Sequence, residues 1–373
     1  MTLYPIQDWD RIHNKTRLSV STLPLLFASL PYRTAVKLRT LAYCRGVIKQ
    51  QRLPGIVVSI GNITTGGTGK TPAVMMMAEW GRKQGYNVAV LSRGYGGKYR
   101  QEILDVSDGK QILAGPEDSG DEPFLLAARL KDVAVIVSRN RYKAGWHAIR
   151  RYGSNFFILD DGFQHLQLAR DIDIVLVDTS NPFGNGHVLP WGPLREPVSH
   201  IRRANICIFT HSADFPTGII EKISRHNKNL SFFFAEHLPE EIVFPGSNER
   251  EQVDFLNKKT VIAFAGIAHP AAFKKTLLDH GADMLYFKRF PDHYSFSGTD
   301  VGFLLEQKKR LGARYLITTE KDWSRLIPFC KDRSDIAILR IRFAITPEHK
   351  DPFFRKITEL IKEHKDSLVP YSS

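Results

Sequence analysis

The residues best suited to chemistry in this chain form a glycine-rich loop that ends in Gly69, Lys70 and Thr71. β-Branched residues precede the loop at 56–60, and a helical pattern opens at Pro72. This order is typical of a phosphate-binding P-loop, in which backbone N–H groups and the positive helix end hold a polyphosphate. There the lysine reaches the β- and γ-phosphates, and the threonine hydroxyl ligates Mg²⁺. The sequence predicts a nucleotide-binding loop made of Thr64, Thr65, Gly66, Gly67, Thr68, Gly69, Lys70 and Thr71.

The loop departs from the common pattern in one place. Thr64 stands where that pattern has glycine, and Gly61, Gly66 and Gly67 supply the flexibility. A glycine-rich turn that merely ends a strand is the alternative. The Gly-Lys-Thr junction between a strand and a helix favours the nucleotide site.

Two adjacent carboxylates, Asp160 and Asp161, end a second apolar strand at 156–159. In a P-loop protein a carboxylate at such a strand end holds Mg²⁺ or its water shell opposite the P-loop threonine. The alternative is an Asp-Asp-Gly turn, in which aspartate is chosen for local hydrogen bonds. With the P-loop upstream, we favour the metal role.

Other polar residues have simpler explanations on sequence alone. Asp121 and Glu122 precede Pro123 at a helix start, where capping and the helix dipole favour acids. His293 lies in a polar turn, and residues 318–322 cap a helix without the spacing of a guanine-reading motif. Basic side chains at strand ends would together suit phosphate groups, although each alone is an ordinary surface charge: Arg93, Arg139, Arg141, Lys143 and Arg195.

The elements that must position these residues alternate in period. Apolar strands are expected at 87–91, 133–137, 156–159, 172–177 and 206–210, separated by helices that include 72–84 and 143–151. This pattern predicts an α/β fold with a parallel sheet covered on both faces, and ligands beyond the carboxyl ends of its strands.

A length of 373 residues suggests two domains, or one large domain with an appendage. We read 1–50 as a basic N-terminal segment, 51–235 as the P-loop core, 236–345 as a smaller α/β lobe and 346–373 as a C-terminal helix. Within this, 212–259 shows few periodic elements and is expected to be a connecting region.

The charge balance points to a polyanionic partner, since 52 basic residues oppose 39 acidic ones. No acidic residue occurs between Arg11 and Ala78, and basic clusters flank an apolar patch at 18–32. A helix lying in an anionic headgroup region fits best. A core-packing hairpin and a nucleic-acid arm are the alternatives, but no nucleic-acid module is present. The three separated cysteines indicate reduced thiols of a cytoplasmic protein.

Taken in order, these motifs resemble one family closely, the tetraacyldisaccharide 4'-kinases (LpxK) of lipid A biosynthesis. The likeness spans roughly 20–325, and the shifted P-loop belongs to that family's own pattern. It rests on 58–62, 65–72, 91–97, 120–123, Arg141, 160–165, 183–186, 192–197, 263–267, 292–293 and 319–322.

The resemblance implies that the γ-phosphoryl group of ATP goes, with Mg²⁺, to the 4'-hydroxyl of an acylated glucosamine disaccharide 1-phosphate, giving lipid IVA. By likeness, Asp121 is the base, His293 assists it from the second lobe, and Lys70 neutralises phosphate charge. The lobes should therefore close over ATP. The metal side would use Thr71, Asp160, Asp161 and Gln164, and the substrate would meet Ser92, Arg93, Gly94, Tyr95, Arg141, Glu122 and Arg195.

The same resemblance places the protein as a peripheral enzyme on the cytoplasmic face of a bacterial inner membrane. We expect a monomer that contacts the anionic membrane surface and binds no nucleic acid. The rival hypothesis is a P-loop ATPase or GTPase whose hydrolysis drives binding to a nucleic acid or a protein.

Overall fold

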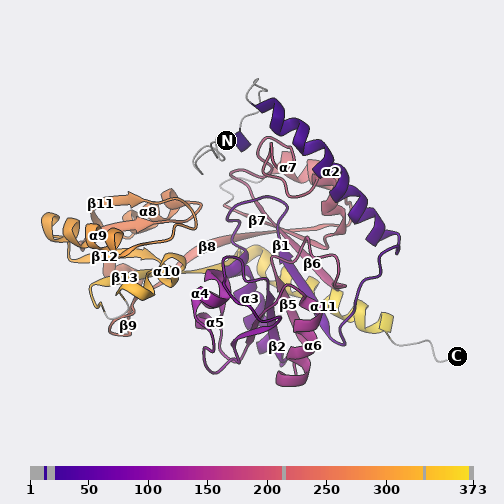
Figure 1. The fold of residues 1–373 in the computed structure, drawn as a ribbon, viewed down its shortest axis with the longest axis horizontal. Helices are drawn as coiled ribbons and strands as arrows, with labels where there is room; N and C mark the ends of the chain where they lie inside the picture. The colour runs from indigo at the N-terminus through magenta and orange to yellow at the C-terminus, as the bar shows by residue number, and fades with distance from the viewer. Residues whose placement is uncertain (1–11, 15–21, 212–215, 331–332, 369–373) are drawn as a thin grey trace.

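In the part of the chain that the structure describes, one sheet of thirteen strands organises the fold. The structure, a computed structural model, describes residues 12–14, 22–211, 216–330 and 333–368. The strand order is β11-β10-β12-β13-β8-β7-β6-β1-β5-β2-β4-β3, with β9 paired to β8. Most neighbouring strands run parallel, and helices cover the sheet (Figure 1). The predicted fold class is confirmed.

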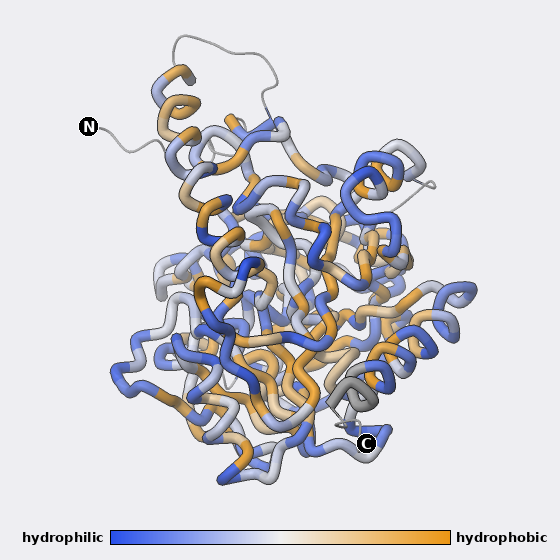
Figure 2. Tube along the Cα trace, turned by 90° about the vertical axis from the view of Figure 1, so that its right-hand side faces the viewer, coloured by the Kyte–Doolittle hydropathy of each residue, from blue (hydrophilic) through white to orange (hydrophobic). Residues whose placement is uncertain are grey.

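The core lobe is built around β1 (Ile56–Gly61), which lies between β5 (Phe156–Asp160) and β6 (Ile172–Asp178). Alternate residues of β1 enter different cores, Val58 beneath α3 and Val57 beneath α6. Both faces of this part of the sheet are therefore apolar. In Figure 2 the hydrophobic colour gathers in the interior of the body. The other elements of this lobe are α3 (Lys70–Lys83), β2 (Val88–Ser92), β3 (Leu104–Ser107), α4 (Pro116–Ser119), α5 (Asp121–Arg129), β4 (Ala134–Val137), α6 (Arg141–Tyr152), η2 (Val198–Arg203) and β7 (Ile206–Thr210).

The second lobe continues the same sheet with parallel strands. Its elements are β10 (Thr260–Ala265), α8 (Pro270–Asp279), β11 (Asp283–Arg289), α9 (Gly298–Leu311), β12 (Tyr315–Thr319), α10 (Glu320–Cys330) and β13 (Ile336–Ile345). Separate apolar clusters lie on the two faces of this part of the sheet.

One strand joins the lobes, and the sequence did not predict it. β8 (Ser231–Phe244) pairs parallel with β7 through its first residues and antiparallel with β13 through the rest. The stretch 212–259, expected to hold few periodic elements, therefore contains the structural link, together with α7 (Thr217–Ser224), β9 (Glu249–Glu251) and η3 (Val253–Leu256). Residue 235, where the core was expected to end, lies inside β8.

The last helix, α11 (Pro347–Leu368), returns to the core lobe. Its Phe353, Ile357 and Ile361 are buried in the cluster that also contains β1 and α3 residues. Because the chain passes through the second lobe and comes back, α11 and β8 both tie the two lobes into one body. Residues 369–373 of the expected C-terminal segment lie outside the described residues.

Near the N-terminus, α2 (Leu23–Cys44) is longer than the apolar patch that predicted it and continues through Pro31. It lies along the outer edge of the molecule (Figure 1). Residues 1–11 and 15–21 of the expected N-terminal segment lie outside the described residues. Within the described part of the chain, no helix has the length and apolar character needed to cross a membrane.

Candidate active site

The P-loop lies between β1 and α3, as the sequence predicted. Gly69, the last residue before α3, has a φ of 82°, and a Cβ there would meet the His237 ring. Asn62 donates to the Thr68 hydroxyl at 3.0 Å, which braces the loop from inside. Thr71 is buried in the first turn of α3. The loop therefore has the left-handed glycine and the adjoining helix start that a polyphosphate cradle requires.

The segment after Gly192 supports the other side of the loop. Thr64 forms an isolated antiparallel β-bridge with Leu194, and the Thr65 N–H donates to the Pro193 carbonyl at 2.8 Å. The Arg195 N–H donates to the Ile63 carbonyl at 2.7 Å. The motif 192–197 therefore holds the loop in place through backbone contacts.

Lys70 meets a carboxylate from the neighbouring strand end. Its Nζ lies 3.7 Å from Asp161 Oδ1, and Arg195 donates to Asp161 Oδ2 at 2.6 Å. Burial opposes ionisation of Asp161, but Lys70 and Arg195 outweigh it and lower the pKa of this carboxyl group. Arg195, expected at the substrate, is thus held beside the phosphate-binding loop.

The neighbouring carboxylate, Asp160, is buried and contacts Ser92 instead of Lys70. Ser92, at the end of β2, donates to its Oδ2 at 2.8 Å, whereas Oδ1 has no hydrogen-bond partner among the described residues. Burial, together with Glu122 and Asp161, raises the pKa of Asp160 to about 7. Ser92 therefore contacts the carboxylate expected at the metal.

Gln164 and Arg141 contact the backbone at the ends of β1 and β5. The Gln164 amide donates to the Asn62 carbonyl and to Glu196, both at 2.8 Å. Arg141 begins α6, is 4% exposed, and its Nη2 lies 3.5 Å from the Asp160 carbonyl oxygen. Burial lowers the pKa of Arg141, against the opposite effect of Asp160. Both side chains therefore support the backbone next to the phosphate-binding loop, at Asn62 and at Asp160.

The loop after β2 forms an exposed rim. The guanidinium of Arg93 lies 5.0 Å from the centre of the Tyr95 ring and donates to its hydroxyl at 2.9 Å. Tyr95 is 64% exposed. Gly94 has a φ of 70°, and a Cβ there would lie 2.5 Å from Val137, so this turn requires glycine.

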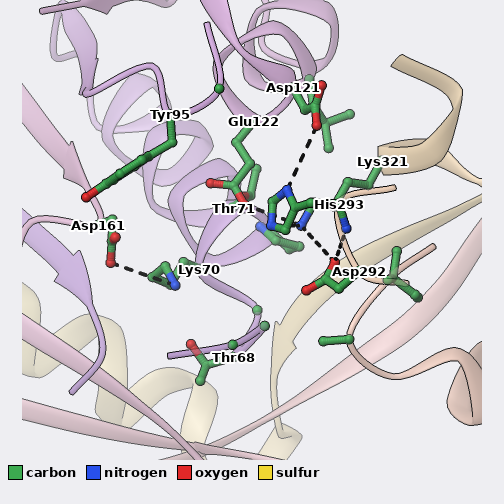
Figure 3. Close-up of a pocket in the computed structure, with 18 of the residues that line it drawn as sticks. Thr68, Lys70, Thr71, Tyr95, Asp121, Glu122, Asp161, Asp292, His293 and Lys321 are labelled. Atoms are coloured by element: carbon green, nitrogen blue, oxygen red, sulfur yellow. Dashed lines mark hydrogen bonds and ion pairs between the residues drawn. The ribbon is translucent and has the colours of Figure 1, made fainter. Parts of the chain in front are cut away.

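Asp121 and His293, distant in sequence, face each other across the cleft (Figure 3). Asp121 begins α5 in the core lobe, and its Oδ2 lies 4.0 Å from Nδ1 of His293. His293 lies between β11 and α9 with a φ of 57°. Burial, followed by the charge of Lys321, lowers the pKa of His293, so the imidazole is neutral at neutral pH.

A lysine and an arginine of α10 complete this side, and sequence reasoning assigned chemistry to neither. Lys321 Nζ lies 3.0 Å from His293 Nε2, 3.5 Å from Glu122 and 3.7 Å from Asp292 (Figure 3). Arg325 donates to Asp121 Oδ2, the oxygen that also faces His293. Lys321 belonged to a recognised motif, but Arg325 had no local signal.

Most of these groups line one cleft of about 2020 Å³, whereas Asp160 and Ser92 lie behind its lining. The P-loop forms one wall, and α10 with the 292–293 turn faces it from the second lobe. A pocket for one small ligand usually measures about 300–1,000 Å³, so this cleft has room for two large ones. No group of three or more His, Cys, Asp or Glu side chains in the described ranges could hold a metal ion. Mg²⁺ in P-loop enzymes relies on one or two carboxylates plus phosphate oxygens.

A P-loop at the carboxyl end of a parallel sheet, with an acid of the same lobe and a histidine that faces this acid from the second lobe, defines a two-lobed P-loop phosphotransferase. The family model of the tetraacyldisaccharide-1-P 4'-kinases matches residues 21–362. The chain belongs to this family, and the resemblance read from its motifs is confirmed.

Individual relatives agree with that assignment. The tetraacyldisaccharide 4'-kinase of Syntrophus aciditrophicus is 38% identical over 365 residues, covering 95% of this chain and 97% of the relative. That of Anaeromyxobacter sp. strain K is 40% identical, with 81% of each chain covered. The solved structure of Aquifex aeolicus LpxK in complex with ATP matches with a TM-score of 0.70 and 30% identity, covering 91% of this chain and 98% of that one. The rival hypothesis of a partner-driven ATPase or GTPase is not favoured.

Proposed function

We propose that this chain transfers the γ-phosphoryl group of ATP to the 4'-hydroxyl of an acylated glucosamine disaccharide 1-phosphate, giving lipid IVA. The observation that carries the proposal is the Asp121–His293 pair, 4.0 Å apart, on the cleft that also contains Lys70. A kinase needs both a phosphate-binding loop and a base, because the phosphate must be held and the acceptor hydroxyl must lose its proton. One chain supplies both, so the proposal takes the enzyme as a monomer.

In this mechanism Asp121 accepts the proton of the acceptor hydroxyl. His293, neutral at neutral pH, offers one ring N–H that can donate to the carboxylate and orient it. Proton removal by a positioned base contributes typically about 10²–10⁴-fold to the rate. Lys70 places its charge beside the phosphate-binding loop, where negative charge develops during transfer.

The residues present fit a magnesium ion. Thr71 lies at the start of α3, and Asp160 carries a buried carboxylate oxygen that has no hydrogen-bond partner in the described part of the chain. These two, with Asp161 and Gln164 nearby, would hold the ion. A magnesium ion held there would supply positive charge that offsets the negative charge of the phosphate groups.

The acceptor would enter along the rim of the core lobe. Arg93 and Tyr95 are exposed there and line the cleft, and they suit a phosphate and a sugar ring. Gly94 allows the turn that presents them. Four further residues expected at the substrate contact other side chains or backbone of the site: Ser92, Arg141, Glu122 and Arg195.

A lipid acceptor also requires contact with the membrane, and α2 provides a surface for it. The inner face of α2 is polar: Ser29 donates to the Val188 carbonyl, and Tyr32 donates to the Arg195 carbonyl at 2.7 Å. Its outer face exposes apolar side chains at helical spacing, Leu23, Phe27, Leu30, Leu38 and Leu41. Basic residues flank this stripe, and no acidic residue occurs before Glu79 in the described part. This pattern supports a peripheral enzyme on the cytoplasmic face of the inner membrane.

The test is mass spectrometry of a purified tetraacyl disaccharide 1-phosphate in detergent, before and after incubation with Mg-ATP. The expected result is a mass increase of one phosphate on the distal sugar. An unmodified lipid, with ATP consumption that rises on adding RNA or protein instead, would favour the rival NTPase.

A further inference from the structure

We propose that Arg325 is a positioning residue that sets the orientation of Asp121 and makes it depend on closure of the two lobes. This inference rests on the proposed function. Arg325 belongs to α10 of the second lobe, yet it donates through Nε to Asp121 Oδ2 of the core lobe. Its side chain is only 7% exposed.

The other nitrogens of Arg325 fix it to its own lobe. Nη1 donates to the Gly266 carbonyl and to Asp322 Oδ1, both at 3.3 Å. Asp322 is fully buried and accepts hydrogen bonds from the Gly266 N–H at 2.9 Å and from the Thr319 hydroxyl at 2.8 Å. The guanidinium is therefore held rigidly at the end of β10 and the start of α10.

Arg325 also lies against both Asp121 and His293. Its Nη2 lies 3.4 Å from His293 Nδ1, the nitrogen that is 4.0 Å from Asp121 Oδ2. The arginine thus sits on the Oδ2 side of the carboxylate together with the histidine. This arrangement leaves Oδ1 as the oxygen that can face an acceptor hydroxyl. A planar guanidinium with fixed donors imposes such an orientation, whereas a lysine ammonium imposes much less.

Because the donors are anchored in one lobe and the acceptor in the other, Asp121 is oriented only while the lobes are together. Misplacement of a reacting group by about 1 Å can cost roughly 10²-fold in rate. Loss of Arg325 should accordingly lower kcat without weakening ATP binding. Its hydrogen-bonding neighbours among the described residues are Asp121, Gly266, Asp322 and His293, and none of them belongs to the P-loop.

The experiment is a double-mutant cycle in the full-length enzyme, with transfer to the lipid acceptor as the readout. We expect Arg325→Gln to lower kcat by about 10²-fold with the KM for ATP within about twofold, and Arg325→Lys to recover part of the loss. In an Asp121→Asn background, Arg325→Gln should lower kcat by less than about threefold, because the arginine acts through that carboxylate.

Arg82→Gln is the control. Arg82 also pairs with an aspartate, Asp132 at 3.0 Å, but this pair is exposed and lies within the core lobe, so its loss does not affect contact between the lobes. It should leave kcat nearly unchanged. Equal losses in both arginine variants, or additive losses in the cycle, would overturn the inference and leave the kinase activity standing. A wild-type enzyme that transfers no phosphate would overturn the proposed function and this inference together.

Discussion

At the scale of single residues, the Asp121–His293 pair makes the sharpest prediction. Asp121→Asn and His293→Ala should each lower phosphoryl transfer by about 10²–10⁴-fold, because each removes part of the proton acceptor. ATP affinity should stay nearly intact, since Lys70 and the loop are untouched. Turnover and nucleotide binding measured side by side check both statements. Asp118→Asn, an exposed acid in α4, is the control, and near-normal turnover in both test variants would refute the pair.

A second residue-scale prediction concerns His237, which packs against Gly69. Burial lowers its pKa from its ordinary value of 6.5 to about 4, and its Nδ1 finds no hydrogen-bond partner within the described ranges. The unfolded chain therefore binds this proton first as the pH falls. Stability that is present above pH 6.5 should be lost progressively toward pH 4, by about 1–3 kcal/mol.

The measurement is urea unfolding at a series of pH values. His237→Phe should flatten the curve between pH 6.5 and 4, whereas His226→Phe, an exposed histidine, should leave its shape unchanged. His269 acts in the opposite sense, because the hydrogen bond that its ring N–H donates to Asp178 raises its pKa. Comparison of variants with the wild type separates the two effects. The prediction would be contradicted if the free energy of unfolding of the His237 variant fell between pH 6.5 and 4 as steeply as that of the wild type.

At the scale of elements, α2 makes a prediction about the membrane. Leu30→Glu or Leu38→Glu places a charge on the exposed apolar stripe and should reduce binding to anionic vesicles several-fold, because apolar burial and lipid charge both oppose it. Vesicle sedimentation measures the bound fraction. Ala35→Glu adds the same charge to an exposed position off the stripe and should cost much less. Equal losses in all three variants would mean that net charge, and not the stripe, governs binding.

Elements also show what the sequence could and could not predict. β1, the P-loop and α3 were predictable, because a buried β-branched run, a glycine turn and a helix start are all local signals. β8 was not, since Ser231–Phe244 crosses two environments, and Glu236, Pro239 and Glu240 interrupt its apolar pattern. Arg325 was invisible for another reason: its partners Asp121 and Gly266 are brought to it only by the tertiary fold.

At the scale of the whole molecule, a buried ion-pair network holds the lobes together. Glu320 of α10 accepts from Arg129 of the core lobe at 3.1 Å and lies 2.8 Å from Arg340 of β13. Burial raises the pKa of Glu320, while the two arginines oppose that shift. The charge is therefore stabilised by partners on both sides of the cleft, one of them from the other lobe.

Glu320→Gln should accordingly lower the free energy of unfolding by about 1–3 kcal/mol, because Arg129 and Arg340 lose the counter-charge that they share and keep only Glu240 and Glu241. Asp279→Asn is the matched change at an exposed pair, with Lys275, and should cost less than about 1 kcal/mol. Urea unfolding gives both values. Because the pair crosses between lobes, the Glu320 variant should also become more sensitive to proteolysis within β8, and Mg-ATP should restore protection by binding the folded form. Equal costs for the two carboxylate-to-amide changes would show that the lobes are held by the continuous sheet and α11 alone.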